Sequence, residues 1–415
     1  MKIISKSQPV RFGSLLRHTF LPGVLVLFTM GTAEAQWTFE PILKAGVERD
    51  DNATLSVRTD DVLDVTGYLV DASVRMDFVG ARSAFYITPR LLSRNYTDNP
   101  EIDSDDVFVR SGYTYTGQKS AFDLVFTYDE QTVRTAERSD ADLDIDDPGD
   151  IPDDETGFVG FQDDREKFRL APAWTYNFSD ATSMNVRANF IATAYADSLQ
   201  VFLNDYTDTR LTLGFDRAFS DRTVGIVEAS VRKYKVDDGS SEADGVSLAA
   251  GFESSLSPTT TARMVVGIED TDSTISQTDP AFTADLSLRR RLETVNILAQ
   301  YRRSISASGV GKLSVRDTAS LNLSRLLSEK IIVGIGARMY QTNSLDDVVT
   351  IDERNYVQLR SQFIWNMTPS FSAEVDYRYT FQKRAALTES SNSNQINLWF
   401  VYSPNRVDRR FSQQL

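Results

Sequence analysis

The sequence predicts an all-β fold, a transmembrane up-and-down antiparallel β-barrel of about 18 strands, and three observations predict it. After residue 35, apolar and polar side chains alternate with a period of two in runs of about 10–17 residues. The connections between these runs alternate strictly between short and long. Aromatic residues gather beside the short connections, as at Trp174, Tyr176 and Phe178, at Trp365 and Phe371, and at Trp37. Strand length, loop asymmetry and an interfacial aromatic belt are together typical of an outer-membrane barrel.

The first 35 residues form a separate segment. An apolar run at 19–30 is preceded by four basic residues, Lys2, Lys6, Arg11 and Arg17, and is followed by the small-residue pattern "AEA" at 33–35. This arrangement predicts a secretory signal peptide that is cleaved near Ala35, so that the mature chain begins at Gln36. A retained anchor helix would need roughly 20 apolar residues, more than this run supplies. We therefore expect three parts: a signal peptide at 1–35, a barrel at 36–404 and a periplasmic tail at 405–415.

The stretch 371–382, "FSAEVDYRYTFQ", shows the alternation clearly. Its odd-numbered residues, from Phe371 to Phe381, are apolar apart from the tyrosine hydroxyls, and its even-numbered residues are polar. The runs at 68–78 and 168–178 alternate in the same way. A soluble sandwich also alternates, but its strands average about 5–6 residues, whereas about 9–11 are needed to cross a bilayer at a tilt. The length of the runs therefore favours a membrane barrel.

One turn recurs along the chain. It appears as "YNFSDATSM" at 176–184 and as "RAFSDRTVG" at 217–225, with weaker copies at 254–262, 325–333 and 365–373. Each copy has an apolar residue, then Ser or Thr, then two residues that favour a tight turn. In an up-and-down barrel every second turn lies at the same, periplasmic end, where turns are short. The recurrence is therefore predicted to be that turn, once per hairpin.

Taken in order, the alternating runs predict eighteen strands with both termini periplasmic. Sixteen or twenty strands are the alternatives, and the drifting spacing of the turns argues against a repeat solenoid or propeller. The expected strands are 37–48, 62–79, 83–96, 106–117, 120–135, 164–178, 182–197, 205–219, 223–237, 245–257, 260–275, 282–292, 295–305, 313–327, 330–344, 351–366, 371–386 and 394–403.

The polar face of these strands is expected to line the lumen, and it is rich in arginine. Lysine is scarce there, and carboxylates such as Asp71, Glu228 and Asp376 are interleaved. One interpretation is structural, with Arg–carboxylate ladders bracing a wide polar wall; the other is a path for anions or hydroxyl-rich sugars, because guanidinium binds carboxylates bidentately and stacks on flat faces. The candidate lumen residues are Arg75, Arg90, Arg94, Arg110, Arg169, Arg187, Arg210, Arg232, Arg263, Arg289, Arg291, Arg302, Arg316, Arg338, Arg360 and Arg378.

The longest connection, about 136–163, is strongly acidic. Its spacing does not fit an EF-hand, and we expect no metal site. It is either a solvated outer loop, with loose bridging by divalent cations as a variant, or, as the third extracellular connection, a constriction loop that folds into the lumen against Arg90, Arg110 or Arg169. The candidate constriction residues are Asp140, Asp142, Asp144, Asp146, Asp147, Asp150, Asp153, Asp154 and Glu155.

Composition excludes several chemistries. The chain has no Cys, and its single His, His18, lies in the predicted signal peptide. Disulfides, thiolate metal sites and Ser-His-Asp catalysis are therefore excluded for the mature chain, and no cofactor is expected. The net charge of −15 becomes −18 when the four basic residues and one acidic residue of the signal are removed, so no nucleic-acid partner is expected.

The stretch "AGVERDDNATLS" at 45–56 resembles the beginning of the β-barrel porins found with bacterial exopolysaccharide-synthesis systems. The leader followed by "QWTFEPILKAGVERDDN", the arginine-rich strands and the Phe-Ser-Asp turns extend the resemblance over the mature chain. The end departs from the pattern, because barrels commonly finish on an aromatic residue and here "NRVDRRFSQQL" follows 404. The resemblance implies a Gram-negative outer-membrane channel that exports an exopolysaccharide.

The resemblance also implies partners: outer-membrane lipid and lipopolysaccharide, the barrel-assembly machinery, the polysaccharide and periplasmic export components. Two other classes of function stay open. A general or substrate-selective porin for passive diffusion of small solutes would share the same barrel. A barrel enzyme or a purely structural barrel is disfavoured, because the mature chain has no His and no Ser or Thr with an evident base.

Overall fold

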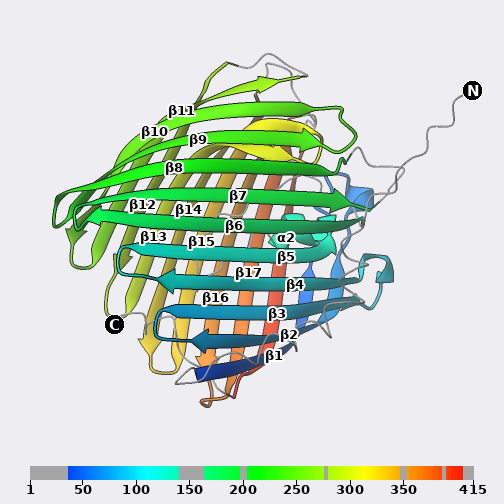
Figure 1. The fold of residues 1–415 in the computed structure, drawn as a ribbon. Coiled ribbons are helices and arrows are strands. Elements are labelled where there is room, and N and C mark those ends of the chain that lie inside the picture. Colours follow the sequence, from blue (N-terminus) through cyan, green and yellow to red (C-terminus); the bar gives the residue numbers. More distant parts are fainter. Residues whose placement is uncertain are drawn as a thin grey trace, which may run out of the picture.

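The computed structural model is a closed antiparallel barrel of eighteen strands and describes residues 36–139, 163–196, 203–274, 279–345, 353–385 and 389–404. Each strand pairs with its neighbours in the chain, and β1 and β18 close the barrel from Leu43↔Tyr402 to Asp50↔Gln395. Figure 1 shows the near-wall strands crossing those of the far wall, as expected for tilted strands in a closed sheet. The predicted fold class is confirmed, with eighteen strands.

The strand bounds differ from the predicted ones by a few residues at most. They are β1 Gln36–Asp50, β2 Val65–Val79, β3 Ser83–Tyr96, β4 Ser104–Thr116, β5 Ser120–Thr132, β6 Asp164–Ser179, β7 Thr182–Tyr195, β8 Tyr206–Ser220, β9 Thr223–Val236, β10 Glu242–Ser257, β11 Thr260–Ser273, β12 Ala281–Arg291, β13 Val295–Ser308, β14 Lys312–Ser328, β15 Ile331–Ser344, β16 Arg354–Asn366, β17 Phe371–Arg384 and β18 Ser390–Tyr402.

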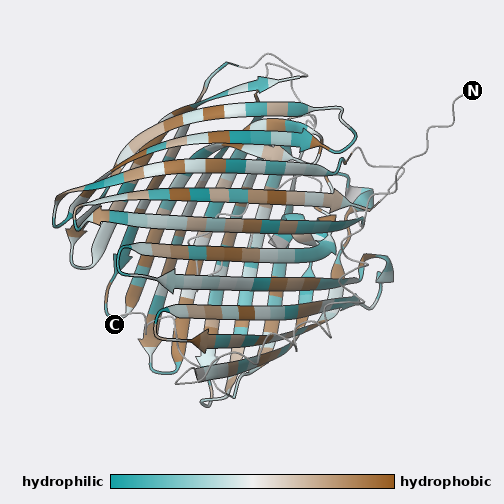
Figure 2. Cartoon of the chain, in the orientation of Figure 1, coloured by the Kyte–Doolittle hydropathy of each residue, from teal (hydrophilic) through white to brown (hydrophobic). Residues whose placement is uncertain are grey.

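The period-two pattern becomes two faces of one wall. On β17, Phe371 and Val375 are 50% and 41% exposed, whereas Glu374, between them, is 6% exposed. Brown and teal residues alternate along the strands in Figure 2, as expected when most apolar side chains of a strand face outward and most polar ones face inward. No described helix is long and apolar enough to span a bilayer.

The recurring turn makes the same side-chain hydrogen bond at each copy. The hydroxyl of Ser179, Ser220, Ser257, Ser328 or Thr368 accepts a hydrogen bond from the backbone N–H two residues later, at 3.3 Å in every case. At four of these turns the strand register also shifts by one residue beside the serine, as a β-bulge does. The turn has two residues at the four serine copies and four residues, 367–370, at the Thr368 copy. In each the hydroxyl replaces a backbone partner, which explains why Ser or Thr recurs there.

The connections at the opposite end carry the helices and are longer, except that only residues 309–311 join β13 to β14, so the strict alternation of short and long connections expected from the sequence fails there. The helices are η1 (Thr59–Asp61), η2 (Pro100–Ile102) and α2 (Val133–Ser139). The prediction that the fifth strand continues to 135 was wrong: β5 ends at Thr132, and the chain turns at once into α2. The Thr132 hydroxyl accepts a hydrogen bond from the Thr135 N–H at 3.2 Å, so it caps this helix.

A buried apolar cluster fills the long-loop end on one side of the lumen. It contains Val133 of α2 and Tyr206 and Tyr234 of β8 and β9. The β13–β14 hairpin reaches this cluster from the other side, because the Tyr234 hydroxyl donates to the Ser308 carbonyl at 3.2 Å and the Asn204 N–H donates to the Gly309 carbonyl at 2.7 Å. Two separated parts of the wall therefore meet inside the barrel, and α2 begins where they meet.

Candidate functional site: the lumen and its inward helix

The strand register places all sixteen arginines that the sequence singled out on the inner face. For example, Asn189↔Arg210, Arg210↔Arg232 and Arg360↔Arg378 lie opposite one another on adjacent strands, on the face away from the exposed apolar side chains. Three more inner-face arginines were missed: Arg165, Arg354 and Arg384. Each lies an even number of residues from an arginine that was named, so the alternation alone could have found them.

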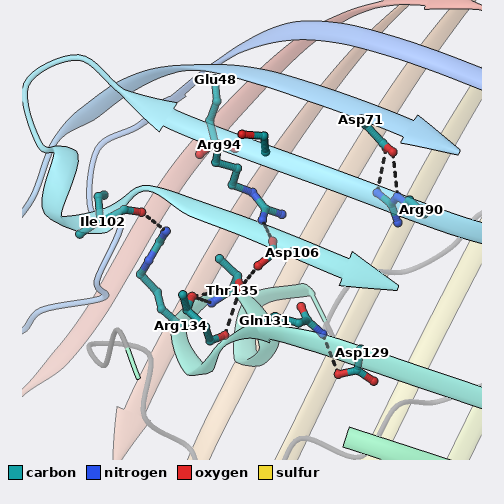
Figure 3. Close-up of polar contacts among 12 residues, drawn as sticks. Glu48, Asp71, Arg90, Arg94, Ile102, Asp106, Asp129, Gln131, Arg134 and Thr135 are labelled. Atoms are coloured by element: carbon teal, nitrogen blue, oxygen red, sulfur yellow. Dashed lines mark hydrogen bonds and ion pairs between the residues drawn. The ribbon is translucent and has the colours of Figure 1, made fainter. Parts of the chain in front are cut away.

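At least nine of the sixteen arginines pair with a carboxylate of the inner wall. On the near wall Arg90 forms two hydrogen bonds of 2.9 Å with Asp71, and Arg94 pairs with Asp106 (Figure 3). All of these pairs except Arg75–Asp77, which lies within β2, join different strands, so they support the structural interpretation of the arginines as braces. The nine pairs are Arg75–Asp77, Arg90–Asp71, Arg94–Asp106, Arg187–Glu228, Arg210–Glu269, Arg232–Asp208, Arg263–Glu228, Arg302–Asp285 and Arg360–Asp376.

A different arrangement occupies the far wall near the long-loop end. The rings of Tyr340 and Tyr356 stack at 4.7 Å with an interplanar angle of 15°. The guanidinium carbons of Arg316, Arg338 and Arg354 lie 5.2, 5.7 and 5.1 Å from the centroid of the Tyr340 ring. Three cations therefore surround one aromatic ring, in the cation–π geometry. We call these five residues the tyrosine–arginine cluster.

Helix α2 lies inside the barrel, where Figure 1 shows it between the near and far walls. Its Val133 and Ala136 are fully buried, and Glu137 is 1% exposed. On the near side, Arg134 donates to the Ile102 carbonyl at 2.8 Å, and the Thr135 hydroxyl donates to Asp106 at 3.0 Å (Figure 3). The helix is thus held by side-chain contacts to segments far from it in the sequence.

The first long connection forms a socket for the end of α2. We call residues 50–56, "DDNATLS" with the last residue of β1, the Asn52 loop. Asn52 organises it, because its side-chain amide donates to the Ser56 carbonyl at 3.0 Å and its side-chain oxygen accepts from the Ser56 N–H at 2.9 Å. Leu55 adopts φ 48°, a left-handed conformation that non-glycine residues rarely adopt and that costs of order 1–3 kcal/mol. The surrounding contacts must therefore stabilise this loop.

Arg138 of α2 is the residue that enters this socket. It donates to the Ala53 carbonyl at 2.6 Å and to Ser393 of β18 at 3.2 Å, and it forms an ion pair with Asp50. The pKa of Arg138 lies above its usual value: burial lowers it, but the charges of Asp50 and Glu48 raise it further. The ion pair with Asp50 therefore favours the cationic guanidinium in this buried position. Residues 50–56, part of the stretch on which the family resemblance rests, thus make the receptor for an inward helix.

Glu137, the preceding residue, reaches the tyrosine–arginine cluster. Arg354 donates to its carboxylate at 2.7 Å, and the two side chains are 2% and 1% exposed. Leu55 of the Asn52 loop packs against Tyr340 and Tyr356, so the loop, the helix and the cluster form one buried assembly. Removing one partner of such a buried ion pair typically costs about 3–5 kcal/mol, because the other charge is left uncompensated.

Helix α2, at the start of the third long connection, lies inside the lumen and contacts Asp50, Asp106 and Arg354. The expected contact of residues 140–155 with Arg90, Arg110 or Arg169 stays a prediction. The acidic residues from Asp140 to Glu155 lie outside the described residues, as do the predicted signal peptide at 1–35 and the tail from 405. Arg134, Glu137 and Arg138 were missed, because a seven-residue helix is too short to show a helical period.

Among known proteins, no family model and no curated protein matches the chain. Solved structures that resemble it include OpdQ of Pseudomonas aeruginosa, with 9% identity, a TM-score of 0.44 and coverage of 88% of this chain and 97% of that one. The siderophore receptor PirA of Acinetobacter baumannii has 6% identity, a TM-score of 0.44 and coverage of 90% and 81%. The outer membrane protein opdK of Pseudomonas aeruginosa has 8% identity, a TM-score of 0.43 and coverage of 88% and 99%. At these scores the function has to be inferred from the residues of this chain.

Proposed function

We propose that the chain is an outer-membrane channel with a transport role and no catalytic one. The observation that carries the proposal is the closed barrel with an apolar outer face and a charged inner face. A bilayer accepts a β-sheet only when every strand is paired, and it accepts an outer face only when that face is apolar. The aromatic pairs Trp37–Phe78 and Phe371–Tyr402 lie at the short-turn end, where a membrane–water interface is expected.

The side chains of the inner wall favour an anionic or hydroxyl-rich molecule as the transported solute. Its arginines offer planar donors for carboxylates, and the tyrosine–arginine cluster adds aromatic surface beside them. Polar neutral side chains such as Gln358, Thr380 and Ser393 line the far wall between the charges. A saccharide that carries carboxylates combines both kinds of partner, so we propose carboxylated saccharides as the solute class.

Within this class, export of an exopolysaccharide is the finer proposal, and the stretch at 45–56 supports it through its family resemblance. Passive diffusion of small solutes is the second candidate. It is favoured by α2, because a helix held inside the lumen at the long-loop end narrows the path that a polymer would have to take. The two candidates share the barrel and differ in the size of what passes through it.

Conductance across planar bilayers tests the channel itself. Purified protein should form ion-conducting pores, and galacturonate trimers should reduce the current more than neutral galactose trimers do. A barrel that conducts no ions would refute the proposal.

A deletion strain separates the two candidates, export of a polysaccharide and passive diffusion of small solutes. Loss of surface polysaccharide on deletion supports export, whereas normal polysaccharide with reduced uptake of small anions supports passive diffusion.

A further inference from the structure

The tyrosine–arginine cluster and Glu137 suggest a specific site within the lumen. We infer that the cluster is a binding site for a carboxylate of the solute, and that Glu137 of α2 occupies the place of that carboxylate in this structure. The inference rests on the proposed transport of anionic solutes and names the group that the wall recognises. Glu137 would then act as an internal competitor, and α2 as the segment that a solute displaces.

The chemistry of the cluster fits a carboxylate ligand. Arg354 already donates to the Glu137 carboxylate at 2.7 Å, with both groups buried. Arg316 and Arg338 bring two further guanidiniums to the same Tyr340 ring. Like charges that gather around one ring repel each other, so an anion placed among them is favoured, and the planar guanidinium donates to a carboxylate through two parallel bonds. The Tyr340 and Tyr356 rings are 3% and 1% exposed, so they position the arginines and are not themselves open to the solute in this structure.

The way in which Glu137 reaches the cluster distinguishes it from the other carboxylates of the lumen. Asp71, Asp208 and Asp376 belong to strands, so strand pairing fixes their backbone beside the arginines. Glu137 belongs to a seven-residue helix in a connection. An isolated helix shorter than about 12–15 residues is marginal in water, so α2 depends on its contacts and can be released without breaking any strand pairing.

The adjacent residue gives the helix an anchor that does not involve the cluster. Arg138 is held by Asp50, Ser393 and the Ala53 carbonyl, on β1, β18 and the Asn52 loop. Glu137 can therefore leave Arg354 while Arg138 keeps α2 attached to β1, β18 and the Asn52 loop. The apparent affinity of a ligand that competes with Glu137 equals its intrinsic affinity multiplied by the fraction of time for which Glu137 leaves the site free.

Binding in detergent solution tests the inference on the full mature chain. Galacturonate trimer, the probe, is titrated into wild type and into Glu137→Gln by calorimetry, with neutral galactose trimer as the reference sugar. The glutamine keeps the shape of the side chain but loses the charge, so the internal competitor is weakened and the affinity for galacturonate should rise about tenfold or more. The double variant Glu137→Gln with Arg354→Gln should lose this gain, because the site itself is removed.

The matched control is Asp317→Asn. Asp317 pairs with Arg303 at 2.8 Å on the β13–β14 hairpin, which also carries Arg316, but this pair lies on the outer face of the barrel. Loss of the Asp317 charge should therefore leave the affinity for galacturonate unchanged. If Glu137→Gln does not assemble, Glu137→Asp keeps the charge on a shorter side chain and should show a smaller gain.

An assembled Glu137 variant that binds galacturonate no better than wild type would overturn the inference, and so would an equal gain for the neutral sugar. Because binding is measured without a membrane, these outcomes are distinct from a failure of the channel to conduct, which would refute the transport proposal instead.

Discussion

At the scale of single residues, burial decides which inner-wall ion pairs matter for stability. The side chains of Arg232 and Asp208 are 3% and 11% exposed, and they form two hydrogen bonds of 2.7 and 2.8 Å. Arg187, which pairs with Glu228 at 2.7 Å, has 43% of its side chain exposed. Arg187 is already partly solvated and screened, and its partner Glu228 also pairs with Arg263 at 3.5 Å, whereas loss of Arg232 would leave Asp208 buried without its arginine. The two pairs therefore have similar geometry but different energetic weight.

We expect Arg232→Met to lower the free energy of unfolding by about 3–5 kcal/mol, because Asp208 would remain buried without its arginine. Arg187→Met, the control on the same wall, should cost no more than about 1 kcal/mol. Urea unfolding of protein folded into lipid vesicles measures both. Equal losses in the two variants would show that burial does not control the strength of these pairs.

Glycine on the inner face of β10 provides a second residue-scale prediction. A Cβ added at Gly251 would lie 1.9 Å from the Met264 carbonyl oxygen, a backbone atom that cannot move without disturbing the β10–β11 pairing. At Gly245, on the same strand and face, the nearest atom would be 3.4 Å away. Gly251→Ala should therefore cost about 1–3 kcal/mol through overpacking, with Gly245→Ala near zero. The fraction of barrel that stays folded in urea compares them directly, and a tolerated Gly251→Ala would contradict the close approach.

At the scale of elements, each strand must satisfy lipid on one face and the lumen on the other. Val375 and Arg378 lie on the same strand, β17, but on opposite faces, with Val375 41% exposed outside and Arg378 8% exposed inside. A substitution at Val375 should therefore affect insertion into lipid, whereas a substitution at Arg378 should affect the lumen.

Val375→Arg, near the middle of β17, should lower the stability by about 2–4 kcal/mol, because a guanidinium would be forced into the hydrocarbon core. Arg378→Gln, the control, can still donate from its amide toward Gln395 and should assemble while changing the ion conductance. Folding yield into vesicles is the measurement for the first effect, and single-channel conductance is the measurement for the second. Equal assembly of the two variants would mean that β17 does not face lipid.

The strands could be predicted from the sequence because the information that specifies them is local. Alternation over 371–382, for example, defines both faces of β17 without reference to any other segment. Helix α2 could not be predicted in this way. Its inward position depends on Val133 fitting among Tyr195, Tyr206 and Tyr234, which lie 62 to 101 residues later in the chain, and on Arg138 meeting the Asn52 loop more than 80 residues earlier.

The residues of the candidate site also fall into those that the sequence could predict and those that it could not. The inner-face arginines followed from parity along each strand, so sixteen of them could be named from the sequence. Which arginines are braces and which belong to a binding site depends on distances between strands. Arg90 has Asp71 on the neighbouring strand, whereas Arg354 meets Glu137 from a helix 217 residues away, and no local pattern distinguishes the two.

At the scale of the whole molecule, closure determines whether the chain can remain in a membrane, and the seam between β1 and β18 is where closure can be tested. The seam contains eight residue pairs, from Leu43↔Tyr402 to Asp50↔Gln395, whereas β1 and β2 pair over fifteen residues. Residues 36–42 of β1 extend beyond the end of β18. The closing ladder is therefore the shorter of the two that β1 forms, and an opened barrel would expose unpaired backbone to lipid.

The absence of Cys makes a direct test of closure simple, because any disulfide must come from introduced residues. Val47 and Leu398 are opposite each other across the seam, and opposite residues of antiparallel strands have Cα atoms about 4.5–5.5 Å apart, within the range that a disulfide bridges. Val47→Cys with Leu398→Cys should therefore cross-link in the folded, oxidised protein. The cross-link joins the two ends of the chain, so the boiled, non-reduced protein should migrate differently in a denaturing gel, and reductant should abolish the difference. Val47→Cys with Phe363→Cys is the matched control: both residues face outward, but Phe363 belongs to β16, which is separated from β1 by β17 and β18. A cross-link in the control, or none across the seam, would mean that β1 and β18 do not close the barrel.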